Sequence, residues 1–235
     1  MTNPNSEFFK GARATLPVLA GVVPFGMIFG ALSIQAHIPN VIAQSMSSVV
    51  FAGSAQFVAT QLISSSVPAL IIIATVTVIN LRHMLYSASV APHIEHLGWR
   101  WKLIFAYLLT DETYVVAISH LQDPVGRETD DNRHLYFLGA GLAMWLSWQT
   151  STALGLFVGQ AIPASWQLDF ALPLTFIALV FPALKDRPAL AAAIVAGLVA
   201  IIAASLPLKL GLIVAATCGI ATGVALERLW PPVTA

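Results

Sequence analysis

Two adjacent acids, Asp111 and Glu112, interrupt an apolar stretch and could hold a charge or a proton. Tyr107, Asp111 and Tyr114 stand at positions i, i+4 and i+7, so we expect them to share one helical face. The Glu112 side chain is rotated about 100° from that face. An ionised side chain in hydrocarbon costs about 2.5–3.5 kcal/mol on insertion scales, so such groups usually face the protein interior or a water-filled path. The acidic pair therefore predicts a site that binds a solute or couples its movement to a proton.

A second polar run surrounds Arg82. Asn80 and His83 lie beside it, and Tyr86 and Ser87 follow Arg82 and His83 by one helical turn. A guanidinium within the bilayer suits a carboxylate, which either the protein or a substrate could provide. Histidine titrates near neutral pH and could relay protons. Two plainer interpretations stay open, a structural ion pair with one of the acids and an arginine that extends to the membrane interface.

Small and polar residues between Phe51 and Phe57 predict a place where a membrane helix could unwind. Gly53, Ser54 and Gln56 lie in this run, and backbone amides exposed at such a break could bind a carboxylate. The sequence 24–26, Pro-Phe-Gly, is a second candidate break. An unbroken helix with a tight crossing is an equal alternative.

Other chemistry finds little support. His93, Glu95 and His96 are too few to predict a metal site, and we expect no metal and no cofactor. We find no nucleophile–base pair and therefore expect no enzyme activity. Cys218 has no cysteine to pair with and is interpreted as a small core residue. The net charge of zero argues against a nucleic-acid partner.

The elements that position these residues follow from composition. The chain is 57% hydrophobic and 9% charged, against about 25% charged in soluble proteins, so lipid must cover its surface. A span needs about 20 mostly apolar residues. We therefore predict an all-α, polytopic transmembrane helical bundle with seven or eight membrane segments, some of them broken or re-entrant. The segments are 15–36, 41–63, 66–91, 102–120, 135–161, 170–184, 188–206 and 209–226.

Charge placement favours eight spans with both termini in the cytoplasm. Seven Lys and Arg residues then lie on the cytoplasmic side and three on the other, with Arg82 inside a span. If the segment 41–63 were a re-entrant loop, all later segments would invert and the agreement would worsen. Residues 1–235 then form one integral membrane domain, because the only extended polar connection, 121–134, is too short to fold separately.

Small residues predict where these helices pack closely. Gly26/Gly30, Gly155/Gly159 and Gly219/Gly223 are each separated by three residues inside apolar segments. Such pairs let helix backbones approach each other in lipid. We interpret them mainly as packing sites within one bundle.

In these motifs the chain resembles the AzlC/YgaZ family, the large subunit of bacterial branched-chain amino acid exporters. The motifs are Pro24-Phe25-Gly26 with Gly30, Phe51 to Phe57, Asn80-x-Arg82-His83-x-x-Tyr86, Leu109-Thr110-Asp111-Glu112-x-Tyr114, Phe170 to Pro173, and Pro182 to Pro188. They follow one another over nearly the whole chain. The resemblance implies an exporter of hydrophobic L-amino acids such as valine, leucine, isoleucine and methionine. It also implies a bacterial inner-membrane location and a small membrane partner of the AzlD/YgaH type.

The residues and the resemblance together suggest a proton-coupled antiporter. The substrate carboxylate would meet Arg82 or the amides of 53–56, its ammonium would meet Asp111 or Glu112, and residues such as Phe25 or Phe57 would line the side-chain pocket. Uniport stays open. So do two rivals, the permease of an ATP-driven amino acid importer and a non-transporting membrane scaffold. No P-loop lies in this chain, so ATP would require a separate subunit.

Overall fold

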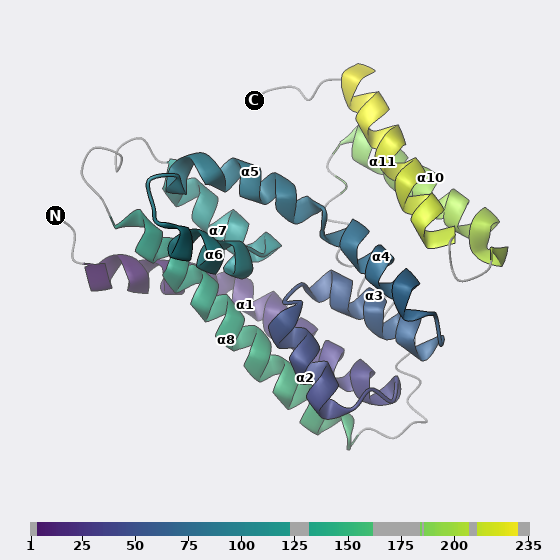
Figure 1. Cartoon of the computed structure of the whole chain (residues 1–235), viewed down its shortest axis with the longest axis horizontal. Helices are drawn as coiled ribbons and strands as arrows, with labels where there is room; N and C mark the ends of the chain where they lie inside the picture. The colour runs from purple at the N-terminus through teal and green to yellow at the C-terminus, as the bar shows by residue number, and fades with distance from the viewer. Residues whose placement is uncertain (1–3, 123–131, 162–183, 185, 207–210, 230–235) are drawn as a thin grey trace. The chain divides into compact units, whose positions relative to one another are not determined.

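The computed structural model describes residues 4–122, 132–161, 184, 186–206 and 211–229. In these ranges the chain is helical and contains no strand, which confirms the predicted all-α fold (Figure 1). The chain divides into two compact units, residues 1–60 with 79–163 and residues 61–78 with 164–235. The helices of the described ranges are α1 (Pro4–Gln35), α2 (Asn40–Val49), α3 (Gly53–Ser64), α4 (Ala69–Asn80), α5 (Arg82–Ile94), α6 (Trp99–Leu108), α7 (Asp111–Gln122), α8 (Arg133–Gly159), α10 (Arg187–Ile202), the 3-10 turn η4 (Ala203–Ser205) and α11 (Gly211–Leu229).

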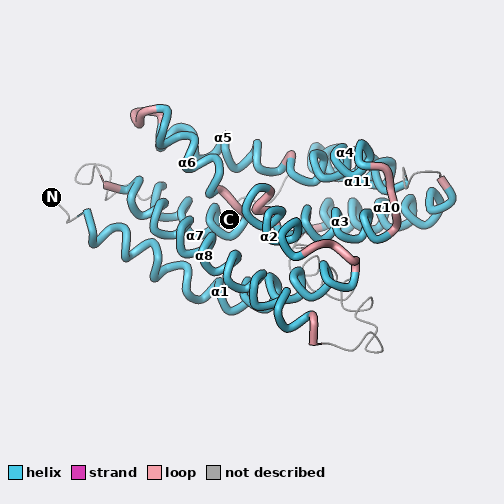
Figure 2. The backbone as a smooth tube through the Cα atoms, turned by 60° about the horizontal axis from the view of Figure 1, so that its bottom comes forward, coloured by secondary structure: helices cyan, strands magenta, loops and turns pink. Residues whose placement is uncertain are grey.

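The first unit is built on α1 and α8, which lie side by side in both views (Figures 1 and 2). Glycines make this contact possible. A Cβ placed on Gly30 would overlap the backbone of Thr152 and Leu156, and one on Gly155 would overlap the backbone of Met27. Only hydrogen atoms fit at these crossings, so the two backbones meet directly, as the glycine spacing predicts.

The 24–26 candidate break is wrong, because α1 continues through it. Pro17 and Pro24 both lie inside this helix. A membrane helix can tolerate proline where its neighbours satisfy the freed backbone groups. The alternative, a tight crossing, is confirmed at Gly26, where a Cβ would overlap Ser151 Oγ of α8.

Three other predicted segments are each divided into two helices. The segment 41–63 contains α2 and α3, and the residues between them include Phe51 with φ of 43°. The break predicted before Gly53 is therefore confirmed. The segment 102–120 is divided at Leu109, whose extended backbone (ψ 94°) ends α6. The segment 66–91 changes from α4 to α5 at Leu81.

Two helical stretches are long and apolar enough to cross a membrane, Ser6–Gln35 with 30 residues and Ala69–Ile94 with 26. The helices of the divided segments 41–63 and 102–120 are each shorter than the 18 residues that this test requires. The number of crossings, the side of each terminus and the single domain 1–235 stay predictions.

The second unit contains α10 and α11, which pack along small residues. A Cβ on Gly219 would lie 2.9 Å from the Ala196 side chain, and one on Gly223 would lie 3.4 Å from Ala192. The third glycine pair thus also packs helices. Asp186 caps α10 by accepting the Ala189 N–H at 2.7 Å. The predicted segment 170–184 lies outside the described residues, apart from Leu184.

Candidate functional site

An ion pair between Arg82 and Asp111 is the centre of the candidate site. Arg82 Nη1 lies 2.7 Å from Asp111 Oδ2, and the side chains are 33% and 35% exposed. Arg82 Nη2 also donates to Ser54 Oγ at 2.5 Å. The ion pair between Arg82 and one of the two acids, which the sequence left open as the plainer interpretation, is therefore present. About a third of each side chain is exposed, so a solute can reach the ion pair.

The sequence breaks position these three groups at helix starts. Ser54 is the second residue of α3, Arg82 the first of α5 and Asp111 the first of α7. Three helix N-termini thus meet around one guanidinium. The partial positive charge of an N-terminus favours the Asp111 carboxylate at its position. The same field would favour a bound carboxylate.

Several polar atoms in this cluster have no hydrogen-bond partner within the described ranges. They are Asn80 Oδ1, Arg82 Nε and Asp111 Oδ1, and each is buried. A buried polar atom without a partner costs about 1–3 kcal/mol, so water or a polar solute is expected to satisfy these atoms.

Glu112 follows Asp111 but has different neighbours, as its rotation around the helix predicts. Its carboxylate interacts with its own amide and with the Thr110 hydroxyl. Thr110 also accepts the Thr113 N–H at 3.3 Å and so caps α7. Among the residues that the structure describes, no cation forms an ion pair with Glu112. In the described part of the chain, the cluster therefore holds one acid paired with Arg82 and one acid, Glu112, without an ion-pair partner.

Aromatic rings connect α5 to α7 beside the ion pair. Tyr86 stacks on Tyr114 with ring centroids 4.7 Å apart and planes at 18°. His83 meets the edge of Tyr86 at 5.9 Å. The Tyr114 hydroxyl donates to Ser89 Oγ at 3.0 Å. The structure thus brings together seven predicted site residues around this pair of helices and the start of α3, namely Ser54, Arg82, His83, Tyr86, Asp111, Glu112 and Tyr114. Asn80, at the end of α4, adjoins them in the chain.

Gln56 and Gly53 belong to a different group, packed against α8. The Gln56 side chain is fully buried, accepts Trp148 Nε1–H at 3.2 Å and donates to Ser47 Oγ at 3.3 Å. A Cβ on Gly53 would lie 3.0 Å from the Trp148 ring and 3.1 Å from Phe25. In the described structure both residues pack helices together, and the polar atoms of Gln56 bind protein groups.

Tyr107 does not share a helical face with Asp111 and Tyr114, so that prediction is wrong. The helix ends at Leu108 and restarts at Asp111, which changes the rotation between them. The Tyr107 hydroxyl instead donates to the Ser48 carbonyl at 2.5 Å and accepts Trp145 Nε1–H at 2.7 Å.

Sequence reasoning missed a second buried acid. Glu7 is 1% exposed and pairs with Lys10 Nζ at 2.6 Å and His120 Nε2 at 3.2 Å. The His120 ring stacks on Tyr136 at 3.9 Å. The predicted first segment began at residue 15, whereas α1 begins at Pro4 and takes Glu7 into the bundle. Ser89 was also missed, because a lone serine on a helix carries no signal of its partner.

No group of three or more metal-binding side chains occurs in the described residues. The polar cluster suits a zwitterionic solute: the guanidinium and helix N-termini attract an anion, and Glu112 attracts a cation.

Comparison with known proteins supports a role for this chain in membrane transport. The family model described as AzlC protein matches residues 17–162. The inner membrane protein YgaZ of Escherichia coli is 25% identical over 234 residues, covering 96% of this chain and 93% of YgaZ. A membrane protein of Archaeoglobus fulgidus is 30% identical over 220 residues, covering 92% and 93% of the two chains.

A third relative is the branched-chain amino acid transport protein AzlC of Bacillus subtilis. It is 24% identical over 180 residues, which cover 74% of this chain and 68% of that protein. No solved structure matches. The family match covers more than half of the chain and includes every residue of the ion-pair cluster, so this helical membrane protein belongs to the AzlC protein family.

Proposed function

We propose that this chain exports hydrophobic L-amino acids, above all valine, leucine and isoleucine, and also methionine, across the bacterial inner membrane. It would act by proton-coupled antiport, together with a small AzlD/YgaH-type membrane subunit. The name of the Bacillus subtilis relative supports the substrate class. The observation that carries the mechanism is the partly exposed Arg82–Asp111 pair beside Glu112, an acid without an ion-pair partner in the described residues.

Each end of an amino acid has a matching group in this cluster. The substrate carboxylate would compete with Asp111 for the Arg82 guanidinium, which can bind a carboxylate through two parallel hydrogen bonds. The substrate ammonium would lie near the acid released from Arg82 and near Glu112. Tyr86 and Tyr114 would form an apolar wall beside the backbone of the substrate.

Proton coupling follows from the same exchange of partners. When the substrate carboxylate takes Arg82, Asp111 and Glu112 share the remaining positive charge of the ammonium. When the substrate leaves, Arg82 pairs with Asp111 again, and Glu112 loses the ammonium beside it and can accept a proton. Export against a tenfold gradient requires about 1.4 kcal/mol, and one charge crossing about 100 mV yields about 2.3 kcal/mol. One proton per substrate is therefore enough.

The test is efflux of radiolabelled L-valine from proteoliposomes that contain the chain and its neighbouring small membrane subunit, with and without a pH gradient. We expect the gradient to drive efflux in the wild type. Glu112→Gln should lose the response to the gradient, because the glutamine amide does not bind or release a proton near neutral pH. The exposed carboxylate Glu227 of α11 provides the control Glu227→Gln, which should behave as the wild type.

Two results would overturn the proposal. Valine efflux that ignores both the pH gradient and Glu112→Gln would remove the coupling. Valine movement that requires added ATP and an ATPase subunit would indicate the rival ATP-driven permease instead.

A further inference from the structure

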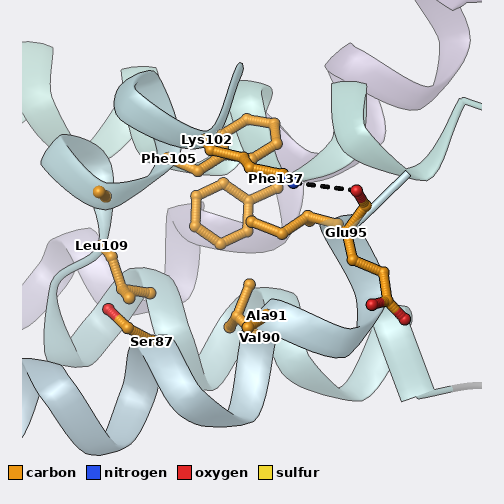
Figure 3. Close-up of a pocket in the computed structure, with 10 residues that line it drawn as sticks. Ser87, Val90, Ala91, Glu95, Lys102, Phe105, Leu109 and Phe137 are labelled. Atoms are coloured by element: carbon orange, nitrogen blue, oxygen red, sulfur yellow. Dashed lines mark hydrogen bonds between the residues drawn. The ribbon is translucent and has the colours of Figure 1, made fainter. Parts of the chain in front are cut away.

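A cavity of about 240 Å³ lies between α5, α6 and α8 in the first unit (Figure 3). The residues that α5 and α6 contribute are spaced at i, i+3, i+4 and i+7, so one face of each of these two helices lines the cavity. Small residues at the centre of these faces leave the space open. The lining residues of α5 are Ser87, Val90, Ala91 and Ile94, and those of α6 with the residue after it are Lys102, Phe105, Ala106 and Leu109.

The wall towards α8 is apolar and closely packed. Phe105 and Phe137 contact each other with ring centroids 4.6 Å apart, and both rings border the cavity in Figure 3. Phe105 is 1% exposed, Phe137 is fully buried and Val90 is 2% exposed. A wall of this kind favours a branched aliphatic group over a polar one.

The end of the cavity near the α5–α6 turn is polar. Lys102 Nζ donates to the backbone carbonyl of Glu95 at 2.9 Å, which holds the ammonium at the rim (Figure 3). An ammonium has three donors, so two remain for a bound carboxylate. Glu95 also lines this end of the cavity, and its carboxylate extends away from the Lys102 ammonium (Figure 3).

The size of the cavity restricts what it can hold. Its volume of about 240 Å³ is smaller than the roughly 300 Å³ at which pockets for drug-sized ligands begin. A free amino acid with a branched side chain has both the right size and the right distribution of charge.

The cavity is separate from the ion-pair cluster. Ser87 follows Arg82 by five residues, so it is rotated about 140° around α5 and displaced about 7.5 Å along it. The Arg82 side of α5 therefore faces α7 through Tyr86, whereas the face that lines the cavity is centred about 130° around the helix from Arg82.

We propose that this cavity is a second binding site for the transported amino acid. Its aliphatic side chain would lie against Phe105 and Phe137, its carboxylate on Lys102 and its ammonium towards Glu95. This proposal rests on the substrate class proposed above, and it predicts two amino acid molecules for each chain.

The experiment measures equilibrium binding of radiolabelled L-leucine to the full chain together with its small membrane subunit in lipid nanodiscs. Ala91→Leu fills the cavity, and its matched control is Ala88→Leu, on an exposed part of the same helix that does not line the cavity. We expect two bound leucines for the wild type and for Ala88→Leu. Ala91→Leu and Arg82→Gln should each bind one, and the double variant none.

A second comparison does not depend on tolerance of a larger side chain. In the Arg82→Gln background, Lys102→Gln should weaken leucine binding at least tenfold. It should leave binding of 3-methylbutylamine, which lacks the carboxylate, within twofold. Arg100→Gln, a change of a nearby exposed cation on α6, should leave both unchanged.

The possible failures are distinguishable. If the wild type binds no leucine, the proposed substrate class fails and this inference fails with it. If Arg82→Gln removes all binding, or Ala91→Leu binds as much leucine as Ala88→Leu, the cavity proposal alone is overturned. A lipid found in the wild-type cavity by native mass spectrometry, absent from Ala91→Leu and not displaced by leucine, would also overturn it.

Discussion

The α1–α8 interface and the cluster around Arg82 lie in the same compact unit but are built in opposite ways. At the interface, glycine at Gly30 and Gly155 lets backbones touch, and a Cβ would have no space. In the cluster, the N-termini of three helices meet. Polar atoms of Asn80, Arg82 and Asp111 have no hydrogen-bond partner there within the described structure. A closed interface holds the helices in place, so an open polar cluster can exchange partners without unfolding the bundle.

The largest expected effect is on the interface. Gly155→Leu should destabilise the fold by about 3 kcal/mol or more, because its side chain would overlap the α1 backbone and no rotamer avoids this. Thermal unfolding in detergent, followed by size-exclusion chromatography, measures the loss of folded protein.

Gly21→Leu is the matched control for that change. Gly21 also lies within α1, but nothing lies within 4 Å of a Cβ built on it. It should unfold at or above the wild-type temperature, since leucine favours a helix over glycine by up to about 1 kcal/mol. Equal losses for the two variants would mean that helix packing at Gly155 is not specific.

The next effect belongs to the cluster and should separate transport from stability. Arg82→Gln removes the ion pair with Asp111 and its bond to Ser54. We expect valine transport to fall about thirtyfold or more, equivalent to about 2 kcal/mol, because hydrogen bonds to a charged group contribute about 1.5–3 kcal/mol. Initial rates in proteoliposomes measure it, with Arg100→Gln as the control. Unchanged transport would favour a purely structural ion pair.

Gln56→Leu tests whether this residue belongs to the interface or to the cluster. The change leaves Trp148 Nε1–H without its acceptor and removes one donor to Ser47 Oγ, which keeps its bond to Thr152, and this should destabilise the fold by about 1.5 kcal/mol. The KM for valine should stay within twofold of the wild type. A raised KM with unchanged unfolding temperature would instead make Gln56 a substrate ligand, as the sequence motif suggested.

The smallest expected effect is the loss of one neutral hydrogen bond between α5 and α7. Tyr114→Phe removes the bond to Ser89 but keeps the ring that stacks on Tyr86, so it should lower stability by about 1 kcal/mol. Ser89→Ala should cost a similar amount, and the double variant little more. Fully additive losses in this double-mutant cycle would show that the bond contributes nothing.

Local patterns predicted much of this fold and part of the site. Glycine spacing predicted close helix packing of the kind seen between α1 and α8, and the small and polar residues between Phe51 and Phe57 predicted a break near the start of α3, because both depend on local backbone geometry. The arginine and the acids predicted their own pairing, since charges in an apolar chain have few other partners.

The failures arose where the answer depends on distant residues. The break at Leu109 carries no glycine or proline, so nothing local separates Tyr107 from the face of Asp111. Gln56 is polar in sequence but buried by Trp148, a contact across 92 positions. In the sequence Glu7 lies in a polar N-terminal stretch, which predicts an exposed side chain. Only the packing of α1 against α7 brings it to His120.

The central claim is that a polar route reaches the Arg82 cluster and that the substrate occupies it. The most direct test places one cysteine at Ser54, which contacts Arg82, in a Cys218→Ser background, since Cys218 is the only native cysteine. Ser47→Cys, at a fully buried position of the packed region, is the control. We predict that a membrane-impermeant thiol reagent labels Ser54→Cys, that L-valine slows this labelling, and that Ser47→Cys stays unlabelled. If Ser54→Cys resists the reagent from both sides of the membrane, or is labelled at the same rate with and without valine, the claim is contradicted.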